Sequence, residues 1–167
     1  MAIASAVAYA DTLSGRVVAI SDGDTITVLD TSDKQHKIRL SAIDAPEKGQ
    51  PFGDRSKQHL SDLLYDKAVA VAWKKYDRYG RIVGKVMVAP PNSCRPARSD
   101  CPKTLDVGLA QITVGLAWHY QKYAKEQTYE DRERYAFAEL EAKAKHVGLW
   151  QDEEPVAPWD WRHFKHQ

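Results

Sequence analysis

The elements that the sequence predicts run in the order strands, helix, strands and then helices, which favours an α+β fold dominated by β-structure. Three observations carry this prediction. They are an Asp-Gly hairpin signal near residue 23, five short strand-like runs before residue 89, and two helical periodicities after residue 104. Five strands with a helix between the third and fourth indicate a five-stranded closed barrel of the OB-fold type, with about three helices packed around it. The length of 167 residues suits one such domain.

The first three strands are predicted from β-branched runs and the turns between them. Runs at 14–20 and 25–29 flank Asp22-Gly23, and Asp-Gly between two such runs is a strong hairpin signal. In the third run, 37–42, apolar and polar residues alternate, so its apolar side chains share one face. Together these runs predict one wall of the barrel.

Hydrophobic spacing predicts the later elements. They are a helix at 54–65, strands at 68–73 and 82–88, and helices at 105–116 and 128–145. Thr128 with Asp131 resembles a capping box at the start of the last helix, and Gly148 stands just past its end.

The chain divides into three segments. In the first segment, 1–12, residues 1–10 are small and apolar, with a small-x-small pattern at 8–10 that is typical of a signal-peptidase site, and Asp11 begins polar sequence. We interpret this segment as a signal-peptide remnant, or alternatively as a disordered Ala-rich tail. Residues 13–150 form the barrel domain, and 151–167 form a C-terminal extension.

Cys94 and Cys101 lie in a Pro-rich polar segment at 90–102. Two thiols cannot complete a four-ligand zinc site, so a local disulfide is the favoured interpretation, with two free, unreactive thiols as the alternative. Such a bond would stabilise the loop by roughly 2 kcal/mol. Together with the signal-like terminus, it predicts a secreted or periplasmic protein.

Composition sets further bounds. The formal net charge is only +1, so any binding of a polyanion must come from locally arranged cations. No apolar run approaches the roughly 20 residues that a membrane span needs, so we expect no membrane anchor in the mature chain.

Three acidic residues, Asp24, Asp44 and Glu47, fall in predicted turns. A single turn carboxylate is ordinarily a solvated cap. These three are accompanied by Arg39, on a strand just before Asp44, and by Arg81, at the start of another strand. The combination suits hydrolysis of a phosphodiester.

The chemistry explains why. A hard divalent cation bound by carboxylate and carbonyl oxygens neutralises and orients a phosphate. A nearby free carboxylate can take a proton from the attacking water. Guanidinium groups suit the extra charge of the transition state, each contributing roughly 3–5 kcal/mol.

Four motifs in order resemble the staphylococcal nuclease family: Asp22-Gly23-Asp24-Thr25, Ile38-Arg39-Leu40, Ile43-Asp44-Ala45-Pro46-Glu47 and Asp77-Arg78-Tyr79-Gly80-Arg81. Two predicted helices and Gly148-Leu149-Trp150 follow them, so the resemblance covers about residues 14–150. It implies a staphylococcal-nuclease-like OB-fold domain over 13–150.

The resemblance implies a metal site. Asp24 and Asp44 match calcium-ligating carboxylates, and Ala45 stands where the family uses a main-chain carbonyl. The implied cofactor is therefore Ca²⁺, although other hard divalent ions suit the same ligands.

The resemblance also implies catalytic and substrate-binding residues. Glu47 matches the catalytic glutamate, and Arg39 and Arg81 match the phosphate-binding arginines. Tyr79 and Tyr120 match positions near the phosphate and base of the substrate. The implied reaction is calcium-dependent cleavage of the P–O5′ bond in DNA and RNA by a monomer, leaving 3′-phosphates.

Two positions depart from the best-known member of the family. Arg78 replaces a lysine, which keeps the charge. Trp118 replaces a tyrosine of the substrate-binding face, so we expect it to stack on substrate, to pack in the core, or both. The extension 151–167 is aromatic and basic, and no motif assigns it a role beyond tethering or packing.

Two alternatives stay open. The first is a non-catalytic OB-fold module that binds nucleic acid, and the second is a barrel that binds carbohydrate or protein, with its arginines and carboxylates paired on the surface. The complete acid and arginine set favours the enzyme. Replacing Arg39, Glu47 or Arg81 is then expected to remove activity with the fold retained.

Overall fold

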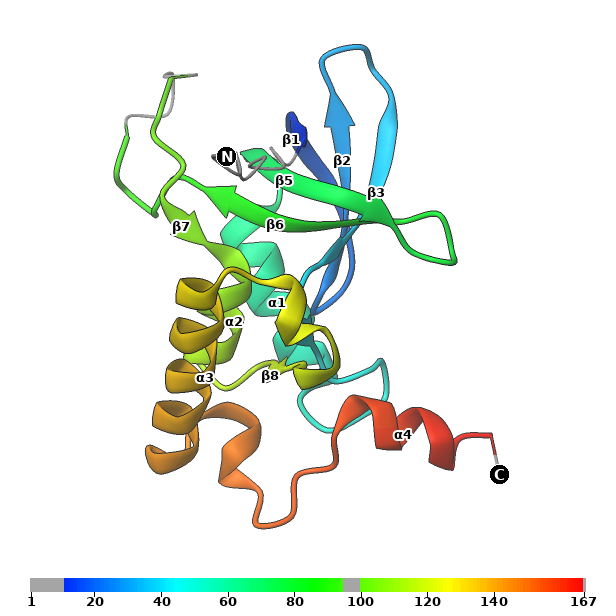
Figure 1. Ribbon diagram of the computed structural model, residues 1–167, viewed down its shortest axis with the longest axis vertical. Coiled ribbons are helices and arrows are strands. Elements are labelled where there is room, and N and C mark those ends of the chain that lie inside the picture. Colours follow the sequence, from blue (N-terminus) through cyan, green and yellow to red (C-terminus); the bar gives the residue numbers. More distant parts are fainter. Residues whose placement is uncertain (1–10, 95–99, 167) are drawn as a thin grey trace, which may run out of the picture.

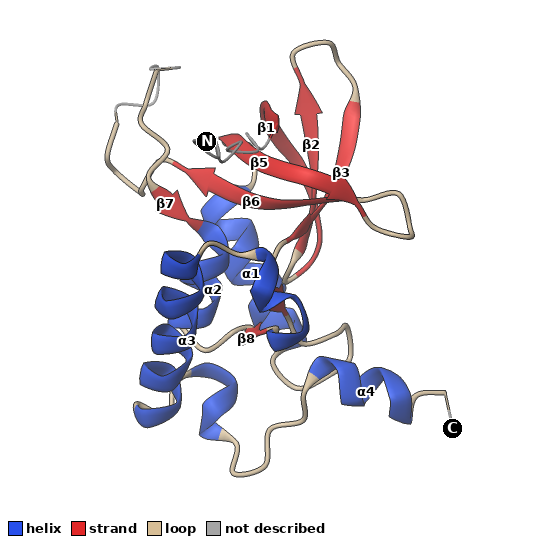
Figure 2. Cartoon of the chain, in the orientation of Figure 1, coloured by secondary structure: helices blue, strands red, loops and turns tan. Residues whose placement is uncertain are grey.

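The computed structural model describes residues 11–94 and 100–166. The strands gather in one half of the molecule and the helices in the other (Figure 2). Of the segment 1–12, interpreted above as a signal remnant or disordered tail, residues 1–10 lie outside the described residues, whereas Asp11 and Thr12 already belong to the first strand.

The described strands are β1 (Asp11–Asp22), β2 (Thr25–Asp30), β3 (Gln35–Leu40), β4 (Ile43–Asp44), β5 (Ala68–Tyr76), β6 (Ile82–Val88), β7 (Leu105–Asp106) and β8 (Trp118–His119). The described helices are α1 (Gly53–Leu64), α2 (Val107–Thr113), α3 (Tyr129–Ala144) and α4 (Pro158–Phe164), with short 3-10 helices η1 (Gln121–Glu126) and η2 (Gly148–Gln151).

The five long strands close into a barrel, as the sequence predicts. Their order is β3-β2-β1-β5-β6, and a parallel pairing of β3 with β6 completes the ring, with Ile38 opposite Ile82 and Leu40 opposite Gly84. A Cβ on Gly84 would lie 2.5 Å from a methyl group of Val71, so a side chain there would not fit without a shift. The α+β barrel of OB type with helices around it is thereby confirmed (Figure 1).

One continuous core joins the barrel to its helices. Val17, Ile26 and Ile38 of the barrel and Leu60 of α1 are fully buried, and Tyr135 of α3 reaches into the same cluster. Burial of a large apolar side chain contributes about 1.5–3 kcal/mol. The barrel end that faces α1, α2 and α3 is therefore rigidly supported, and the turns at that end are held in place.

The helices follow the predictions with shifts at their ends. Thr128 caps α3, because its Oγ1 accepts a hydrogen bond from the N–H of Asp131 at 3.1 Å. The Asp131 carboxylate does not complete a capping box, since both its oxygens bind Lys85 Nζ. The predicted helix 105–116 was too long: Leu105 and Asp106 form β7, and the Asp106 side chain caps α2.

Two further predictions concern the remaining segments. The disulfide between Cys94 and Cys101 is present, with 6.0 Å between the Cα atoms. The extension 151–167 contains α4, which the sequence did not predict. Within the described ranges, every helix is too short or too polar to serve as a transmembrane span.

The turn between β1 and β2 packs directly onto α1. A Cβ on Gly23 would lie 1.9 Å from Oγ of Ser56, so only glycine allows this approach. Nearby, β4 pairs with β8, which places Asp44 opposite Trp118. The β1–β2 turn and β4 therefore meet at one end of the barrel.

Candidate active site

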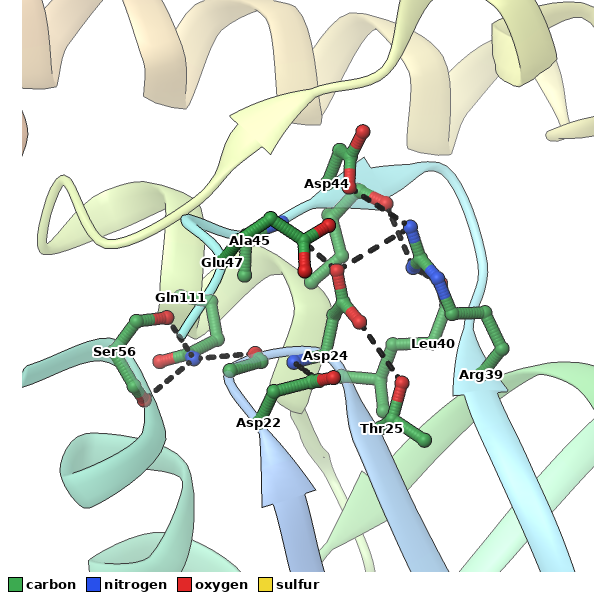
Figure 3. Close-up of polar contacts among 12 residues, drawn as sticks. Asp22, Asp24, Thr25, Arg39, Leu40, Asp44, Ala45, Glu47, Ser56 and Gln111 are labelled. Atoms are coloured by element: carbon green, nitrogen blue, oxygen red, sulfur yellow. Dashed lines mark hydrogen bonds and ion pairs between the residues drawn. The ribbon is translucent and has the colours of Figure 1, made fainter. Parts of the chain in front are cut away.

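Two of the predicted metal-ligating residues lie side by side. Asp24 lies in the β1–β2 turn and Asp44 ends β4, and both are buried. Asp24 Oδ2 accepts a hydrogen bond from the N–H of Ala45 at 2.8 Å, and Asp24 Oδ1 accepts one from Thr25 Oγ1 at 3.0 Å (Figure 3). The turn of one hairpin is thus bonded to the chain segment that carries the second carboxylate.

Arg39 links these two carboxylates. Its Nη1 donates to the carbonyl oxygens of Leu40 and Ile43, both at 2.8 Å. Its Nη2 lies 3.2 Å from Asp44 Oδ1 and 3.3 Å from Asp24 Oδ2 (Figure 3). The guanidinium is largely buried, so it serves as an internal bridge between β3 and the acidic residues.

A third carboxylate, Asp22, joins this cluster, and the sequence analysis assigned it no role. Its Oδ1 accepts a hydrogen bond from the N–H of Asp24 at 3.0 Å. Burial, together with the neighbouring charge of Asp24, raises the pKa of Asp22 to about 7. Burial also raises the pKa of Asp44, although Arg162 and Arg39 oppose the shift. Burial therefore favours the neutral form of both carboxyl groups, while the nearby guanidiniums favour the ionised form of Asp44.

A buried amide holds the acidic turn in place. Gln111 of α2 donates from Nε2 to the carbonyl oxygens of Gly23, at 2.7 Å, and Ser56, at 3.1 Å (Figure 3). Its Oε1 is hydrogen-bonded to His59. The sequence analysis missed this residue, because a single glutamine on a predicted helix carries no signal for a partner 88 residues away.

Arg81 differs from Arg39. Its Nε donates to Asp77 Oδ2 at 2.7 Å, and Asp77 Oδ1 accepts from the main-chain N–H groups of Tyr79 and Arg81. Within the described part of the chain, its Nη groups donate to no protein acceptor. Burial acts to raise the pKa of Asp77, but the bonds from Arg81 and Tyr79 outweigh it and lower that pKa. Asp77 therefore positions the Arg81 guanidinium through Nε and leaves its two Nη groups able to bind a ligand.

A pocket of about 650 Å³ gathers the predicted catalytic residues. Its walls include the predicted site residues Asp24, Arg39, Asp44, Glu47, Tyr79, Arg81 and Tyr120. It also includes basic and aromatic residues that the prediction did not contain: Lys75, Tyr76, Arg78, Lys122, Tyr123 and Arg162. The fold thus brings the five predicted ionic residues to one cavity that opens to solvent, although they are separated in sequence: Asp24, Arg39, Asp44, Glu47 and Arg81.

Two predicted site residues lie elsewhere. Ala45 is buried and contributes its N–H to Asp24 rather than lining the pocket. Trp118 packs edge-to-face against Trp150 and Trp159, with ring centroids 4.5 and 5.5 Å apart. The packing half of the expectation for Trp118 is therefore confirmed, while its predicted contact with substrate stays a prediction.

Arg162 of α4 is the largest addition to the predicted site. Its Nη1 donates to Glu47 Oε1 at 2.6 Å and to Asp44 Oδ1 at 3.2 Å, and its Nη2 donates to Asp44 Oδ2 at 2.7 Å. The bonds to Asp44 and then to Glu47 raise the pKa of Arg162. Its position in sequence, 118 residues from Asp44, explains why no motif pointed to it.

The donor set matches a hard cation in its chemistry. Asp24 and Asp44 offer buried carboxylate oxygens, which Ca²⁺ prefers, and the carboxyl group of Asp22 lies beside them. In the ranges 11–94 and 100–166, no three His, Cys, Asp or Glu side chains already converge on one point as ligands. Arg39 and Arg162 instead occupy the carboxylate oxygens.

Sequence comparisons with known proteins find one matching family model and several similar relatives. Residues 37–152 match the family model described as staphylococcal nuclease homologue. A micrococcal nuclease of Shigella flexneri is 40% identical over 160 residues, covering 96% of this chain and 86% of the relative. An uncharacterized endonuclease of Haemophilus influenzae is 41% identical over 147 residues, covering 88% and 71%. The protein ParB of Escherichia coli is 42% identical over 151 residues, covering 90% and 79%.

Proposed function

Because this chain belongs to the staphylococcal nuclease family, we propose that it is a metal-dependent nuclease that hydrolyses phosphodiester bonds of DNA and RNA. The observation that carries the proposal is the single pocket that collects three carboxylates and two arginines, Asp24, Asp44, Glu47, Arg39 and Arg81. The names of the relatives, a micrococcal nuclease and an endonuclease, support the same class of reaction.

The metal ion of the proposal is Ca²⁺. Asp24, Asp44 and the main-chain carbonyl of Ala45 would hold it, with Arg39 keeping the two carboxylates at a fixed separation. When bound, the ion neutralises and orients the phosphate of the substrate. The grouping of the Asp22, Asp24 and Asp44 carboxyl groups at one place supports a divalent cation there.

Glu47 is the proposed proton acceptor. Its carboxylate is about one-third exposed and lines the pocket, so water can reach it. As the water oxygen bonds to phosphorus, a water proton passes to Glu47, and the P–O5′ bond breaks. The departing 5′-oxygen takes a proton and becomes a hydroxyl, and the phosphate stays on the 3′ end of the other fragment.

Arg81 is the proposed transition-state residue. The attacked phosphorus gains negative charge on its oxygens, and the unpaired edge of the Arg81 guanidinium suits that charge. Tyr79, whose ring lies under the guanidinium carbons of Arg78 and Arg81, would contact the phosphate, and Tyr120 would contact the base.

The test is cleavage of plasmid DNA and of RNA by the purified chain in Ca²⁺, Mg²⁺, Mn²⁺ or chelator. We expect cleavage in Ca²⁺, none in chelator, and a rate reduced by about two to four decades in Glu47→Gln. Glu133→Gln, an exposed substitution on α3, is the matched control and keeps the wild-type rate. Intact substrates with all three metals would exclude a nuclease and favour a module that only binds nucleic acid.

The location of the protein is part of the proposal. The disulfide between Cys94 and Cys101 supports an oxidising compartment, either the periplasm or the medium. Fractionation of cells that produce the chain with its native leader should recover it outside the cytoplasm, with no thiol that reacts before reduction. Recovery of a fully reduced cytoplasmic protein would contradict this location.

A further inference from the structure

The C-terminal extension lies across the candidate active site rather than beside it. Gln50, in the loop after β4, donates from Nε2 to the carbonyl oxygen of Val156 at 2.7 Å, and Ala157 and Pro158 are buried. The start of α4 is therefore tied to the loop that carries Glu47. The match to the family model ends at residue 152, so α4 lies beyond the segment that the model covers.

Arg162 occupies the carboxylates that the proposed mechanism needs to be free. Both oxygens of Asp44 and one oxygen of Glu47 accept hydrogen bonds from its guanidinium, at 2.6 to 3.2 Å. Such charge-assisted, two-pronged bonds are the strong kind. The Asp44 carboxylate also pairs with Arg39, so two guanidiniums share it.

The same helix also covers the predicted base-binding ring. Trp159 stacks face to face on Tyr120, with ring centroids 5.1 Å apart and an angle of 10° between the planes. Its edge packs on Trp118, the other predicted base-binding residue. A nucleobase and the Trp159 indole therefore compete for one face of Tyr120.

We propose that α4 is an intramolecular inhibitory cap, in which Arg162 takes the place of the cation on Asp44 and engages the proton acceptor Glu47, while Trp159 takes the place of a base on Tyr120. The inference rests on the proposed function, because it assigns Asp44 to the cation. Cation and cap exclude each other, since the oxygens of Asp44 are already engaged and the two positive charges repel. Divalent cation and substrate then open the cap by binding the uncapped state.

Population linkage gives the expected magnitude. If only a minor fraction of the molecules is uncapped, the apparent affinity for the cation equals the intrinsic affinity multiplied by that fraction. Removing the Arg162 guanidinium should therefore tighten Ca²⁺ binding by about tenfold or more. The direction of the change in Ca²⁺ affinity distinguishes the two roles of Arg162. Loss of a residue that only supports the site would weaken Ca²⁺ binding, whereas loss of a competing residue tightens it.

The first experiment is calorimetric titration of the full-length chain with Ca²⁺ alone. The variants are Arg162→Ala and the control Arg134→Ala, an exposed arginine on α3 whose loss changes the net charge equally. We expect a lower Kd only in Arg162→Ala. An unchanged or higher Kd in Arg162→Ala, an equal decrease in both variants, or no Ca²⁺ binding by any form would overturn the cap.

The second experiment reports the cap itself. Amide hydrogen exchange of residues 158–164 is followed in the full-length chain in chelator and in saturating Ca²⁺. We expect faster exchange in Ca²⁺, and in Trp159→Ala we expect fast exchange in both conditions. If α4 exchanges at one rate in wild-type protein with and without Ca²⁺, the competition does not exist.

These readouts separate the cap from the function. If Ca²⁺ binds more tightly to Arg162→Ala but DNA and RNA stay intact, the cap holds and the nuclease proposal fails. If the wild-type chain cleaves DNA in Ca²⁺ while Arg162→Ala changes neither Kd nor exchange, the nuclease proposal holds and the cap fails.

Discussion

Arg39 Nη2 lies 3.2 Å from Asp44 Oδ1, and its Nη1 donates to the carbonyl oxygens of Leu40 and Ile43. Arg81, by contrast, lines the pocket, and among the described residues its guanidinium donates only from Nε, to Asp77, while its central carbon lies over the Tyr79 ring. The two arginines that the motifs treat alike therefore have different physical roles. Arg39 positions the carboxylates, and Arg81 is available for the phosphate.

We expect Arg39→Lys and Arg81→Lys to separate these roles. Lysine cannot reproduce the four contacts of Arg39, so Arg39→Lys should destabilise the fold by about 1–3 kcal/mol and weaken Ca²⁺ binding. Arg81→Lys keeps a positive charge beside Asp77, so it should change stability and Ca²⁺ affinity less than Arg39→Lys does, but it should reduce kcat by about two decades or more. Urea unfolding, calorimetry and cleavage rates measure the three effects.

Two outcomes would contradict these different roles of Arg39 and Arg81. If Arg39→Lys retains wild-type stability and Ca²⁺ affinity while losing activity, its internal bonds do not support the site. Equal losses of stability in both variants would show that the outer edge of Arg81 is not free. The expectation from sequence, loss of activity with an unchanged fold, is therefore kept for Arg81 and changed for Arg39.

The pH dependence of stability should depend on Asp77. Its pKa is lowered in the folded protein, so its ionised form stabilises the fold above the unfolded pKa, and this stability is lost as the pH falls through the folded pKa. Wild type should thus be more stable than Asp77→Asn near neutral pH, and the gap should close as the pH falls through the folded pKa, below the ordinary range of aspartate. Urea unfolding in chelator measures it. A gap that is constant with pH would show that the ionised carboxylate contributes nothing.

Gln111 should be needed for the position of the acidic turn. Gln111→Leu keeps the volume but leaves the buried carbonyl of Gly23 without its donor, which costs about 1–3 kcal/mol. The control is Gln58→Leu on the exposed side of α1, which should change the unfolding free energy by less than about 0.5 kcal/mol. Similar effects of the two substitutions on chemical unfolding would argue against this role of the Gln111 amide.

The sequence predicted the barrel because its signals are local. The Asp-Gly turn, the alternation in β3 and the Thr128 cap each act within a few residues, and each is present in the structure. The helix predicted at 105–116 was wrong at its first two residues. Residues 105 and 106 pair with β6 and so belong to the sheet.

Only the site residues that belong to the family motifs could be predicted from the sequence. Asp24, Asp44 and Glu47 were placed by motif, and the structure brings them to the predicted pocket. Gln111 and Arg162 were not, because their partners lie 88 and 118 residues away and no spacing rule connects them. Such contacts are fixed by tertiary packing, which the local sequence does not encode.

The most direct test of the whole account is the effect of Asp44→Asn on Ca²⁺ binding, measured by calorimetry on protein whose fold is verified by circular dichroism. Asp33→Asn is the control, because Asp33 is an exposed turn aspartate with a positive φ of 59° that asparagine also adopts. We predict that Asp44→Asn weakens Ca²⁺ binding by at least about tenfold and that Asp33→Asn leaves it unchanged. Wild-type Ca²⁺ affinity in Asp44→Asn would contradict the account.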